Sequence, residues 1–457
     1  MNAALDPALL AAVSESIEAQ LGLQFPPERW SDLERGLRGA ATDLGFESME
    51  KCARELVLAK LNRGQIDSLA EHLTIGETYF FRDPAAFEIL VSDVIPALAR
   101  ARRCTAKRLR IWSAGCCTGE EPYSLAIALY RAIPDLDDWQ ITILATDINP
   151  RFLRKAAEGI YGPWSFRGVP DEMRDRWFRK TKDGRFEILH TIRKMVTFDC
   201  LNLVDDVYPS LTNNTNAMDL IFCRNVLMYF SPAHVQRVAA NFRRSLVEGG
   251  LFVVSASEAS RETFSEFAPG DISGIALYRK EAPAMPPPLF PPSPLLLREW
   301  LPEPPPISLP VRAPEPAPIP RALPVPPPDH AAEARRLANV GRLADSLAAC
   351  DRAVAADKLV AAHHYLRGVI LQELGALDDA AAALRSALYL DHDFILAHFG
   401  LGHLLLRQDR NREAARCFAN ARALLENCAP DSRPPESDGM TAGRLLAILD
   451  SMQEVIA

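Results

Sequence analysis

Residues 109–124 read Leu109-Arg-Ile-Trp-Ser-Ala-Gly-Cys-Cys-Thr-Gly-Glu-Glu-Pro-Tyr-Ser124, which predicts a buried strand, a glycine turn and the start of a helix. The strand is the apolar run around Ile111. Gly115 and Gly119 allow backbone angles that a Cβ atom would forbid, and they let a ligand approach the main chain. In an open α/β sheet, a turn at the carboxyl end of a strand is where a nucleotide-like ligand binds.

The spacing of these glycines, G-x-x-x-G, differs from the G-x-G-x-x-G with which a dinucleotide fold holds a pyrophosphate. Glu120 and Glu121 follow, and an acidic helix start would repel a pyrophosphate but tolerate a cationic or neutral ligand. A second strand ends at Asp147, and an acid there can hold both ribose hydroxyls. These features fit S-adenosylmethionine, in which a sulfonium replaces the phosphates, and they leave another α/β ligand open.

Composition limits the classes of function. A chain of 457 residues should hold about two to four domains. The net charge of -8 argues against broad nucleic-acid binding. The nine cysteines form no C-x-x-C pair, so neither a metal site nor a disulfide framework is expected and a reduced cytoplasmic setting is the simplest interpretation. We see neither a signal peptide nor an apolar run near the ~20 residues of a membrane helix, and expect no direct membrane insertion.

Four domains or segments are expected along the chain, and the first two extend to about residue 280. Residues 1–75 are predicted to be all helical, with acidic and basic residues equally numerous, so a solvated face of mixed charge is the default. A patch that docks an acidic partner is the alternative, and it requires that folding segregates the signs. Strands and helices then alternate to about residue 280, which predicts a mostly parallel sheet. Trp177–His190 is predicted to be a hairpin around Asp183-Gly184, a small flap near 177–195 inserted into the larger sheet.

The stretch before the first strand carries three consecutive aromatic residues, Tyr79 to Phe81, followed by Arg82. A buried linker with one exposed arginine is one interpretation. The other places Thr78 and Arg82 over the ligand, and this stretch alone leaves both open.

Four motifs match one family as a set. They are Glu77–Pro84, Trp112–Ser124, Ala145–Ile148 and Phe222–Phe230. Together they resemble the CheR family of chemoreceptor glutamate methyltransferases, over residues 1 to about 280. The resemblance implies a Rossmann-like class I methyltransferase fold in residues 76–280, S-adenosylmethionine as methyl donor, and N-terminal helices that dock a receptor. It implies as acceptor a glutamate on the cytoplasmic helices of a methyl-accepting chemoreceptor.

The resemblance also implies the site residues. The donor site would comprise Thr78, Arg82, Glu121, Asp147, Asn202, Leu203, Cys223 and Arg224. Arg82 and Tyr229 would lie nearest the transferred methyl group as catalytic residues, with a core role for Tyr229 as the alternative. Gly76 departs from family members that have a side-chain amide there, and its backbone is expected to substitute.

The residue types agree with this chemistry. A glutamate is ionised at neutral pH, because its ordinary pKa is about 4.3, so the nucleophile needs no general base. The sequence offers no Ser/His/Asp set and no paired catalytic carboxylates. The task left to the enzyme is to align a carboxylate oxygen with the methyl carbon and to exclude water. The flap is short beside those of family members that grip a receptor's C-terminal tether peptide, which favours a tether-independent enzyme.

The remainder of the chain predicts a spacer and a repeat module. Residues 281–328 hold 20 of the 36 prolines, which favours extended polyproline II. Residues 329–457 follow a 34-residue period that resembles tetratricopeptide repeats, three of them over 331–429, with a capping helix at Thr441–Val455. Such arrays bind a protein or peptide in a concave groove. A helical bundle without repeat geometry is the alternative.

The prediction as a whole is a cytoplasmic, receptor-modifying methyltransferase that is recruited to membrane receptor arrays and carries a tethered protein-binding module. The domain order resembles the WspC type, which serves a surface-sensing pathway. Two alternatives remain: a methyltransferase for another protein or small molecule, and a non-catalytic adaptor that binds S-adenosylmethionine. The presence of Arg82 and Tyr229 weighs against the adaptor.

Overall fold

The computed structural model describes residues 5–449 apart from 59, 104–106, 271, 273, 282–328, 409 and 447. By their contacts, residues 1–281 and 330–457 belong to one compact unit. Apart from residue 281, the proline-rich segment predicted as a spacer lies outside the described residues.

Four helices form the N-terminal part of the chain, joined by a short 3-10 turn at Pro27–Arg29. They are α1 Pro7–Leu21, α2 Trp30–Asp43, α3 Met49–Leu58 and α4 Arg63–Leu73. Asp6 caps α1, and Asn62 with Gln65 makes a capping box at α4, which explains where these helices begin. Their apolar stripes, for example Val13 on α1 and Leu33 on α2, meet in one buried cluster.

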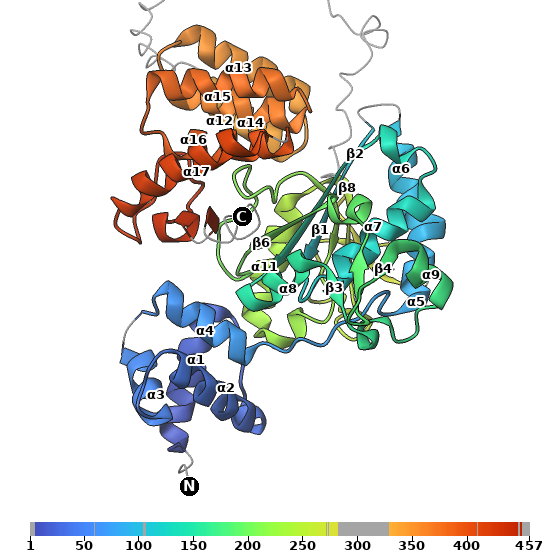
Figure 1. Cartoon of the computed structure of the whole chain (residues 1–457), viewed down its shortest axis with the longest axis vertical. Helices are drawn as coiled ribbons and strands as arrows, with labels where there is room; N and C mark the ends of the chain where they lie inside the picture. The colour runs from blue at the N-terminus through green and yellow to red at the C-terminus, as the bar shows by residue number, and fades with distance from the viewer. Residues whose placement is uncertain are drawn as a thin grey trace, which may run out of the picture. The chain divides into compact units, whose positions relative to one another are not determined.

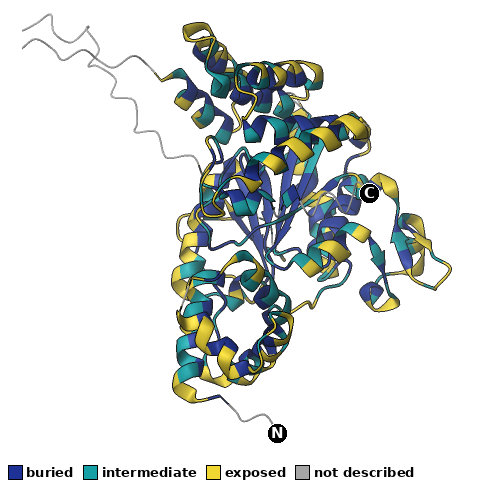
Figure 2. Cartoon of the chain, turned by 60° about the vertical axis from the view of Figure 1, so that its left-hand side comes forward, coloured by how far each residue is buried: buried dark blue, intermediate teal, exposed yellow. Residues whose placement is uncertain are grey.

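The central element is a seven-stranded sheet in the order β6-β2-β1-β7-β8-β10-β9. Its strands are β1 Arg108–Ala114, β2 Gln140–Asp147, β6 Val196–Cys200, β7 Met218–Phe222, β8 Leu246–Val254, β9 Ala268–Pro269 and β10 Ala276–Arg279. The first five strands in that order are parallel, while β10 and β9 pair antiparallel at one edge. The parallel strands are largely buried (Figure 2), as expected for a sheet that is covered on both faces.

Alternate residues of the central strand enter two separate cores. Leu109 and Ile111 of β1 face one core, which includes helix α7, and Trp112 and Ala114 face the other, which includes helix α11. Figure 1 accordingly shows these two helices on opposite sides of the sheet. The helices of this part are α5 Pro84–Ile89, α6 Ile95–Arg103, α7 Glu120–Ala132, α8 Pro150–Glu158, α9 Asp171–Trp177, α10 His190–Arg193 and α11 Pro232–Ser245, with a π-helical turn at Leu90–Val94.

The flap differs from its prediction in one respect. The hairpin is present, as β4 Phe178–Lys180 and β5 Phe186–Ile188, but β3 Ile160–Tyr161 joins them in a separate three-stranded sheet rather than in the larger one. The reason is a local aromatic core, because Phe178 packs against Phe80 with ring centroids 4.8 Å apart.

Three helix pairs make up the C-terminal repeats. They are α12 His330–Asn339 with α13 Leu343–Ala356, α14 Ala361–Glu373 with α15 Leu377–Leu390, and α16 Ile395–Arg407 with α17 Asn411–Glu426. A Cβ atom at Gly368 would lie 2.7 Å from Leu384, and one at Gly402 would lie 2.5 Å from Phe418, so the 34-residue glycine period marks close helix contact. Residues 442–446 and 448–449 of the predicted capping helix are helical, and the remainder of it lies outside the described residues.

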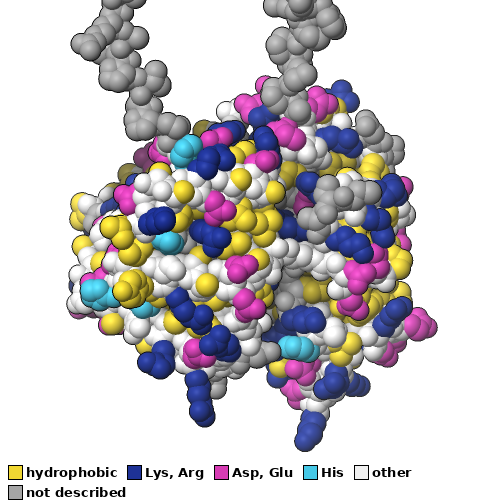
Figure 3. Space-filling model, turned by 90° about the horizontal axis from the view of Figure 1, so that it is seen from above, with side chains coloured by type: hydrophobic (Ala, Val, Ile, Leu, Met, Phe, Trp, Pro, Cys, Tyr) yellow, Lys and Arg dark blue, Asp and Glu magenta, His cyan; other side chains and the backbone are white. Residues whose placement is uncertain are grey.

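The described residues also show how apolar the helices are and how charge is distributed on one face. None of their helices combines the length and apolar character that crossing a membrane requires. On the face drawn in Figure 3, basic and acidic side chains are interspersed rather than gathered by sign.

Candidate active site

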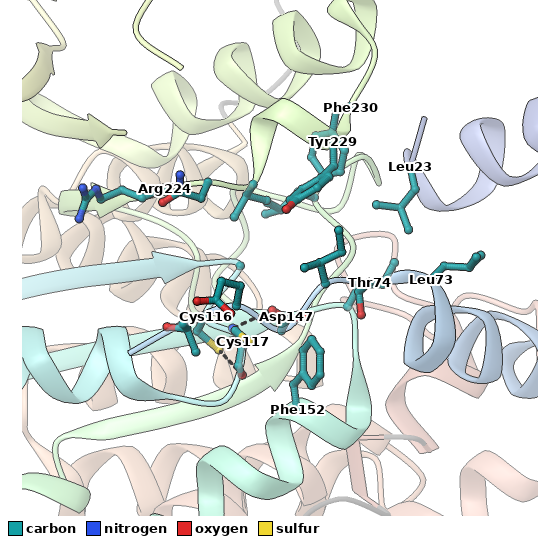
Figure 4. Close-up of a pocket in the computed structure, with 18 of the residues that line it drawn as sticks. Leu23, Leu73, Thr74, Cys116, Cys117, Asp147, Phe152, Arg224, Tyr229 and Phe230 are labelled. Carbon is teal, nitrogen blue, oxygen red and sulfur yellow. Dashed lines mark hydrogen bonds between the residues drawn. The ribbon is translucent and has the colours of Figure 1, made fainter. Parts of the chain in front are cut away.

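An open cavity lies at the carboxyl ends of β1, β2, β6 and β7, and its empty space, together with the solvent at its mouth, amounts to about 1070 Å³. Its other wall comes from the connection between α1 and α2, through Leu23, Phe25 and Arg29, and from the stretch that follows α4. The predicted residues that line it are Thr78, Arg82, Glu121, Asp147, Asn202, Leu203, Arg224 and Tyr229. Residues from six separate stretches therefore converge on one space (Figure 4).

The glycine turn after β1 forms the floor of the cavity. Gly115 has a φ of +80°, and a Cβ atom there would collide with Val226. The N–H groups of Gly115 and Cys116 both donate to the Thr146 carbonyl, at 2.7 and 2.9 Å, which ties the turn to the end of β2. The turn is thus held in the conformation that brings main chain to the cavity.

Asp147 is a nearly buried carboxylate at the cavity wall. It accepts hydrogen bonds from the N–H of Cys117 at 2.8 Å and from the N–H of Asn149 at 2.9 Å. Burial raises its pKa to about 6, although these backbone donors stabilise the ionised form. A carboxylate oxygen has room for further acceptor contacts, so Asp147 can receive hydroxyl donors from a ligand in the cavity.

Glu121 is the second carboxyl group of the cavity. The Ser113 hydroxyl donates to it at 2.7 Å. Burial raises its pKa to about 7, against the lowering effects of that hydrogen bond and of Arg224 and Arg82. A ligand with a positive charge would favour the ionised form of this carboxyl group.

Arg224 joins two predicted motifs. Its guanidinium donates to the Asp83 carboxylate at 2.7 Å and to the Arg82 carbonyl at 2.8 Å, while Asp83 also caps α5. The Nε atom of Arg224 is buried and has no hydrogen-bond partner among the described residues. Arg82 itself is half-buried, and it donates to the Glu77 carbonyl at 2.7 Å.

Tyr229 ends a short 3-10 turn, Leu227–Tyr229, that follows β7. Its ring packs on the core of the N-terminal helices, and its hydroxyl points into the cavity (Figure 4). The Tyr229 carbonyl accepts from the N–H of Gln24 at 2.8 Å, so the N-terminal segment is bound along this wall.

One carboxylate that the sequence analysis missed holds this loop. Glu258 accepts hydrogen bonds from the N–H groups of Asn225, Val226 and Met228, at 2.7, 2.8 and 3.3 Å. Asn225 has a φ of +59°, which few non-glycine residues adopt. Glu258 lies about thirty residues further along the chain in an unremarkable polar stretch, so no sequence signal marks it.

The side chain of Asn202 lines the cavity but is already engaged in hydrogen bonds within the protein. Its side-chain amide donates to the Gln20 carbonyl at 3.0 Å and to Asp205 at 3.4 Å, and its oxygen accepts from the N–H of Val204 at 3.3 Å. It therefore ties helix α1 to the loop after β6 while lining the cavity with Leu203.

Cys223 is not brought to the cavity. Its side chain is fully buried in the core on the α11 side of the sheet, and its N–H donates to the Val253 carbonyl at 3.0 Å. The placement follows from strand alternation, because Phe222 points to the opposite core.

Phe152 on α8 lines the cavity and was also missed. It explains the departure at Gly76, where a Cβ atom would lie 2.8 Å from the end of the Phe152 ring. The signal that could have found it is the Asn149-Pro150 cap, which starts a helix directly after Asp147 and places Phe152 in its first turn.

Comparisons with known proteins agree on one family. Residues 76–270 match the family described as "CheR methyltransferase, SAM binding domain". The chain is 34% identical over 203 residues to chemotaxis protein methyltransferase 2 of Vibrio cholerae, covering 44% of this chain and 69% of that protein. It is 30% identical over 399 residues to the probable biofilm formation methyltransferase WspC of Pseudomonas aeruginosa, covering 84% and 91%. The second match spans the repeats as well as the sheet.

Proposed function

The chain belongs to the CheR family of S-adenosylmethionine-dependent protein methyltransferases, and we propose that its acceptor is a glutamate on the cytoplasmic helices of a methyl-accepting chemoreceptor. The methyl ester would tune receptor signalling. The observation that carries the proposal is the cavity itself, which is lined by the carboxyl groups of Asp147 and Glu121 together with Arg82 and Tyr229.

The residues of the cavity fit the donor. Asp147 would accept hydrogen bonds from ribose hydroxyls, and Glu121 would face the positive charge of the donor. The unpartnered Nε of Arg224 offers a further donor group at the same wall. Bound S-adenosylmethionine supplies an electrophilic methyl group, which an ionised carboxylate accepts without a general base.

The chain's own part in the reaction would then be positioning and the exclusion of water. Arg82 would orient the acceptor carboxylate or the donor's own carboxylate, and the Tyr229 hydroxyl would steady the methyl region. Leu23 and Phe25 give the opposite wall an apolar surface, and Phe230 adds to it beside Tyr229, which would remove water from a weak nucleophile.

Two partners remain predictions. The helices of residues 1–75 would dock the receptor and bring the enzyme to membrane receptor arrays, and the repeats would bind an unknown protein or peptide. The flap strands β4 and β5 have three residues each, which supports a tether-independent enzyme. Tight binding of an isolated receptor C-terminal peptide would contradict that.

The test is incubation of the full-length protein with methyl-labelled donor and cell membranes. A base-labile label on a receptor glutamate is the expected result, because carboxyl methyl esters hydrolyse in base. Label on another protein or on a small molecule would support the first alternative. Donor binding without any transfer would support the adaptor.

A further inference from the structure

The connection between β6 and β7, residues 201–217, carries part of the donor cavity. It is also bound by the repeat array, by which we mean the three helix pairs and the segment that follows them to residue 449. Leu201, Asn202 and Leu203 at its beginning line the cavity. Residues 1–281 and 330–457 belong to one unit, so contacts between this connection and the repeats are part of the same body.

The first of these contacts is Arg444. Its guanidinium donates to the Cys200 carbonyl at 2.9 Å and to the Asp205 carboxylate at 3.2 Å. The Arg444 side chain is 10% exposed, whereas the Asp205 side chain is 42% exposed, so the guanidinium is the buried partner of this pair. Asp205 in turn accepts from the Asn202 amide and, through its N–H, donates to the Asn202 carbonyl at 3.2 Å. Arg444 therefore binds both ends of the turn, Cys200 and Asp205, between which Asn202 lines the cavity.

The second contact lies further along the same connection. Leu211 packs against the apolar cluster formed by α12, α13 and α14. The hydroxyls of Ser210 and Thr212 donate to Asp438 at 2.7 and 3.2 Å. Arg335 of α12 and Tyr365 of α14 border a small pocket at this place, so residues 210–212 occupy the face formed by the first helices of consecutive pairs.

We propose that the repeat array braces the donor site: it grips the connection at Arg444 and around residues 210–212, and it keeps the turn at residues 200–205 in the shape that donor binding needs. Arg444 is a positioning residue, because it touches the turn and not the cavity. A protein ligand that took the face of α12 and α14 would have to displace residues 210–212. Occupancy of the array and affinity for the donor would then be coupled.

The brace is tested in the full-length protein by calorimetric titration with S-adenosylhomocysteine. Arg444→Ala should raise the Kd on the order of five- to tenfold, within the usual range of coupling between sites. It should raise the KM for S-adenosylmethionine similarly and leave kcat at saturating donor near the wild-type value. Arg444→Lys, which keeps the charge, should recover part of the affinity. Arg410→Ala, an exposed arginine of the same array paired with Glu413, should bind like wild type.

Hydrogen exchange separates bracing from general damage. Backbone amides of residues 201–205 should exchange faster in Arg444→Ala and as in wild type in Arg410→Ala. Asp438→Ala removes the partner of Ser210 and Thr212 without touching the turn, and it should weaken donor binding by a smaller factor. Because Asp438 is exposed, this variant can replace Arg444→Ala if that protein does not fold. If Arg444→Ala folds, an unchanged Kd and unchanged exchange in that variant would overturn the proposal. If Arg444→Ala does not fold, the same result in both Arg444→Lys and Asp438→Ala would overturn it. Because the readout is donor binding, the result does not depend on which acceptor is methylated.

Discussion

Two carboxyl groups with raised pKa values share the cavity, and they predict how donor binding depends on pH. Glu121, with a pKa of about 7, is mostly neutral at pH 6 and mostly ionised at pH 8. A cationic donor favours the ionised form, so affinity should rise roughly tenfold between these pH values if only that form binds. Titration calorimetry in buffers of different ionisation enthalpy would show the accompanying proton release.

The matched variant for this prediction is Glu121→Gln. It should shift the remaining dependence toward pH 6, where Asp147 titrates. Donor affinity that is flat or falls across the range in the wild type would exclude an ionised Glu121 from the binding site.

Arg82 is predicted to be required for transfer and dispensable for folding. It is half-buried, and its guanidinium contacts only the Glu77 carbonyl and the Tyr79 ring among the contacts described. Arg82→Ala should therefore lower turnover on the order of a hundredfold, the size of a positioning loss, with little change in thermal unfolding. Arg167 also lies over the Tyr79 ring but outside the cavity lining, so Arg167→Ala is the matched control. Near-normal turnover of Arg82→Ala would remove Arg82 from the mechanism.

At the residue scale, sequence patterns predict a site residue only where neighbouring residues in the chain determine its position. Asp147 could be placed because a strand, an acid and a helix cap follow one another directly. Cys223 could not be separated from the cavity residues, because β7 is buried on both faces and apolar character does not tell a core from a site. Glu258 could not be found because its partners, Asn225 to Met228, are main-chain groups that carry no side-chain signature.

Glu258 holds the loop that carries Tyr229 in one conformation, because its carboxylate binds three main-chain N–H groups of that loop. Glu258→Ala would leave the N–H groups of Asn225 and Val226 without their acceptor, which should cost at least about 2 kcal/mol of stability. Because the loop then moves Tyr229, kcat should fall more than donor affinity. Denaturant unfolding and steady-state kinetics check the two effects.

Glu262→Ala is the control variant, because Glu262 lies close to Glu258 in the sequence, is exposed and does not line the cavity. Glu262→Ala should resemble wild type in both measurements. A Glu258→Ala protein with normal kcat would show that the loop does not position Tyr229 for transfer.

Among the elements, those with strong local patterns were predicted, such as β1 at Arg108–Ala114, which the apolar run around Ile111 indicates. The flap was the exception, because pairing of short strands is decided by the aromatic contacts of Phe80 and Phe178, which lie almost a hundred residues apart. Local turn chemistry at Asp183-Gly184 predicts a hairpin but not the sheet that it joins.

At the scale of the whole molecule, one buried cluster fastens the repeats to the sheet. Glu373 at the end of α14 pairs with Arg108 and Arg110 of β1, and all three side chains are at most 14% exposed. Although burial alone would raise it, the charges of Arg110 and Arg108 hold the pKa of Glu373 below its ordinary value. The contact joins residues 263 positions apart, so no sequence pattern could predict it.

Removal of Glu373 should be costly, because it leaves two buried arginines without their carboxylate. We expect Glu373→Ala to destabilise the protein by about 3 kcal/mol in denaturant unfolding. Glu413→Ala, which breaks an exposed pair on α17, should have little effect. Equal, small effects of the two variants would mean that the cluster does not fasten the array.

The central claim is that the donor binds at the carboxyl ends of the strands, with its sugar held by Asp147. Titration of the full-length protein and of Asp147→Asn with S-adenosylhomocysteine measures this directly. We predict one site per wild-type chain and at least about tenfold weaker binding in the variant, from the loss of a charged acceptor. No heat with the wild-type protein, or equal affinity in the two proteins, would contradict the account.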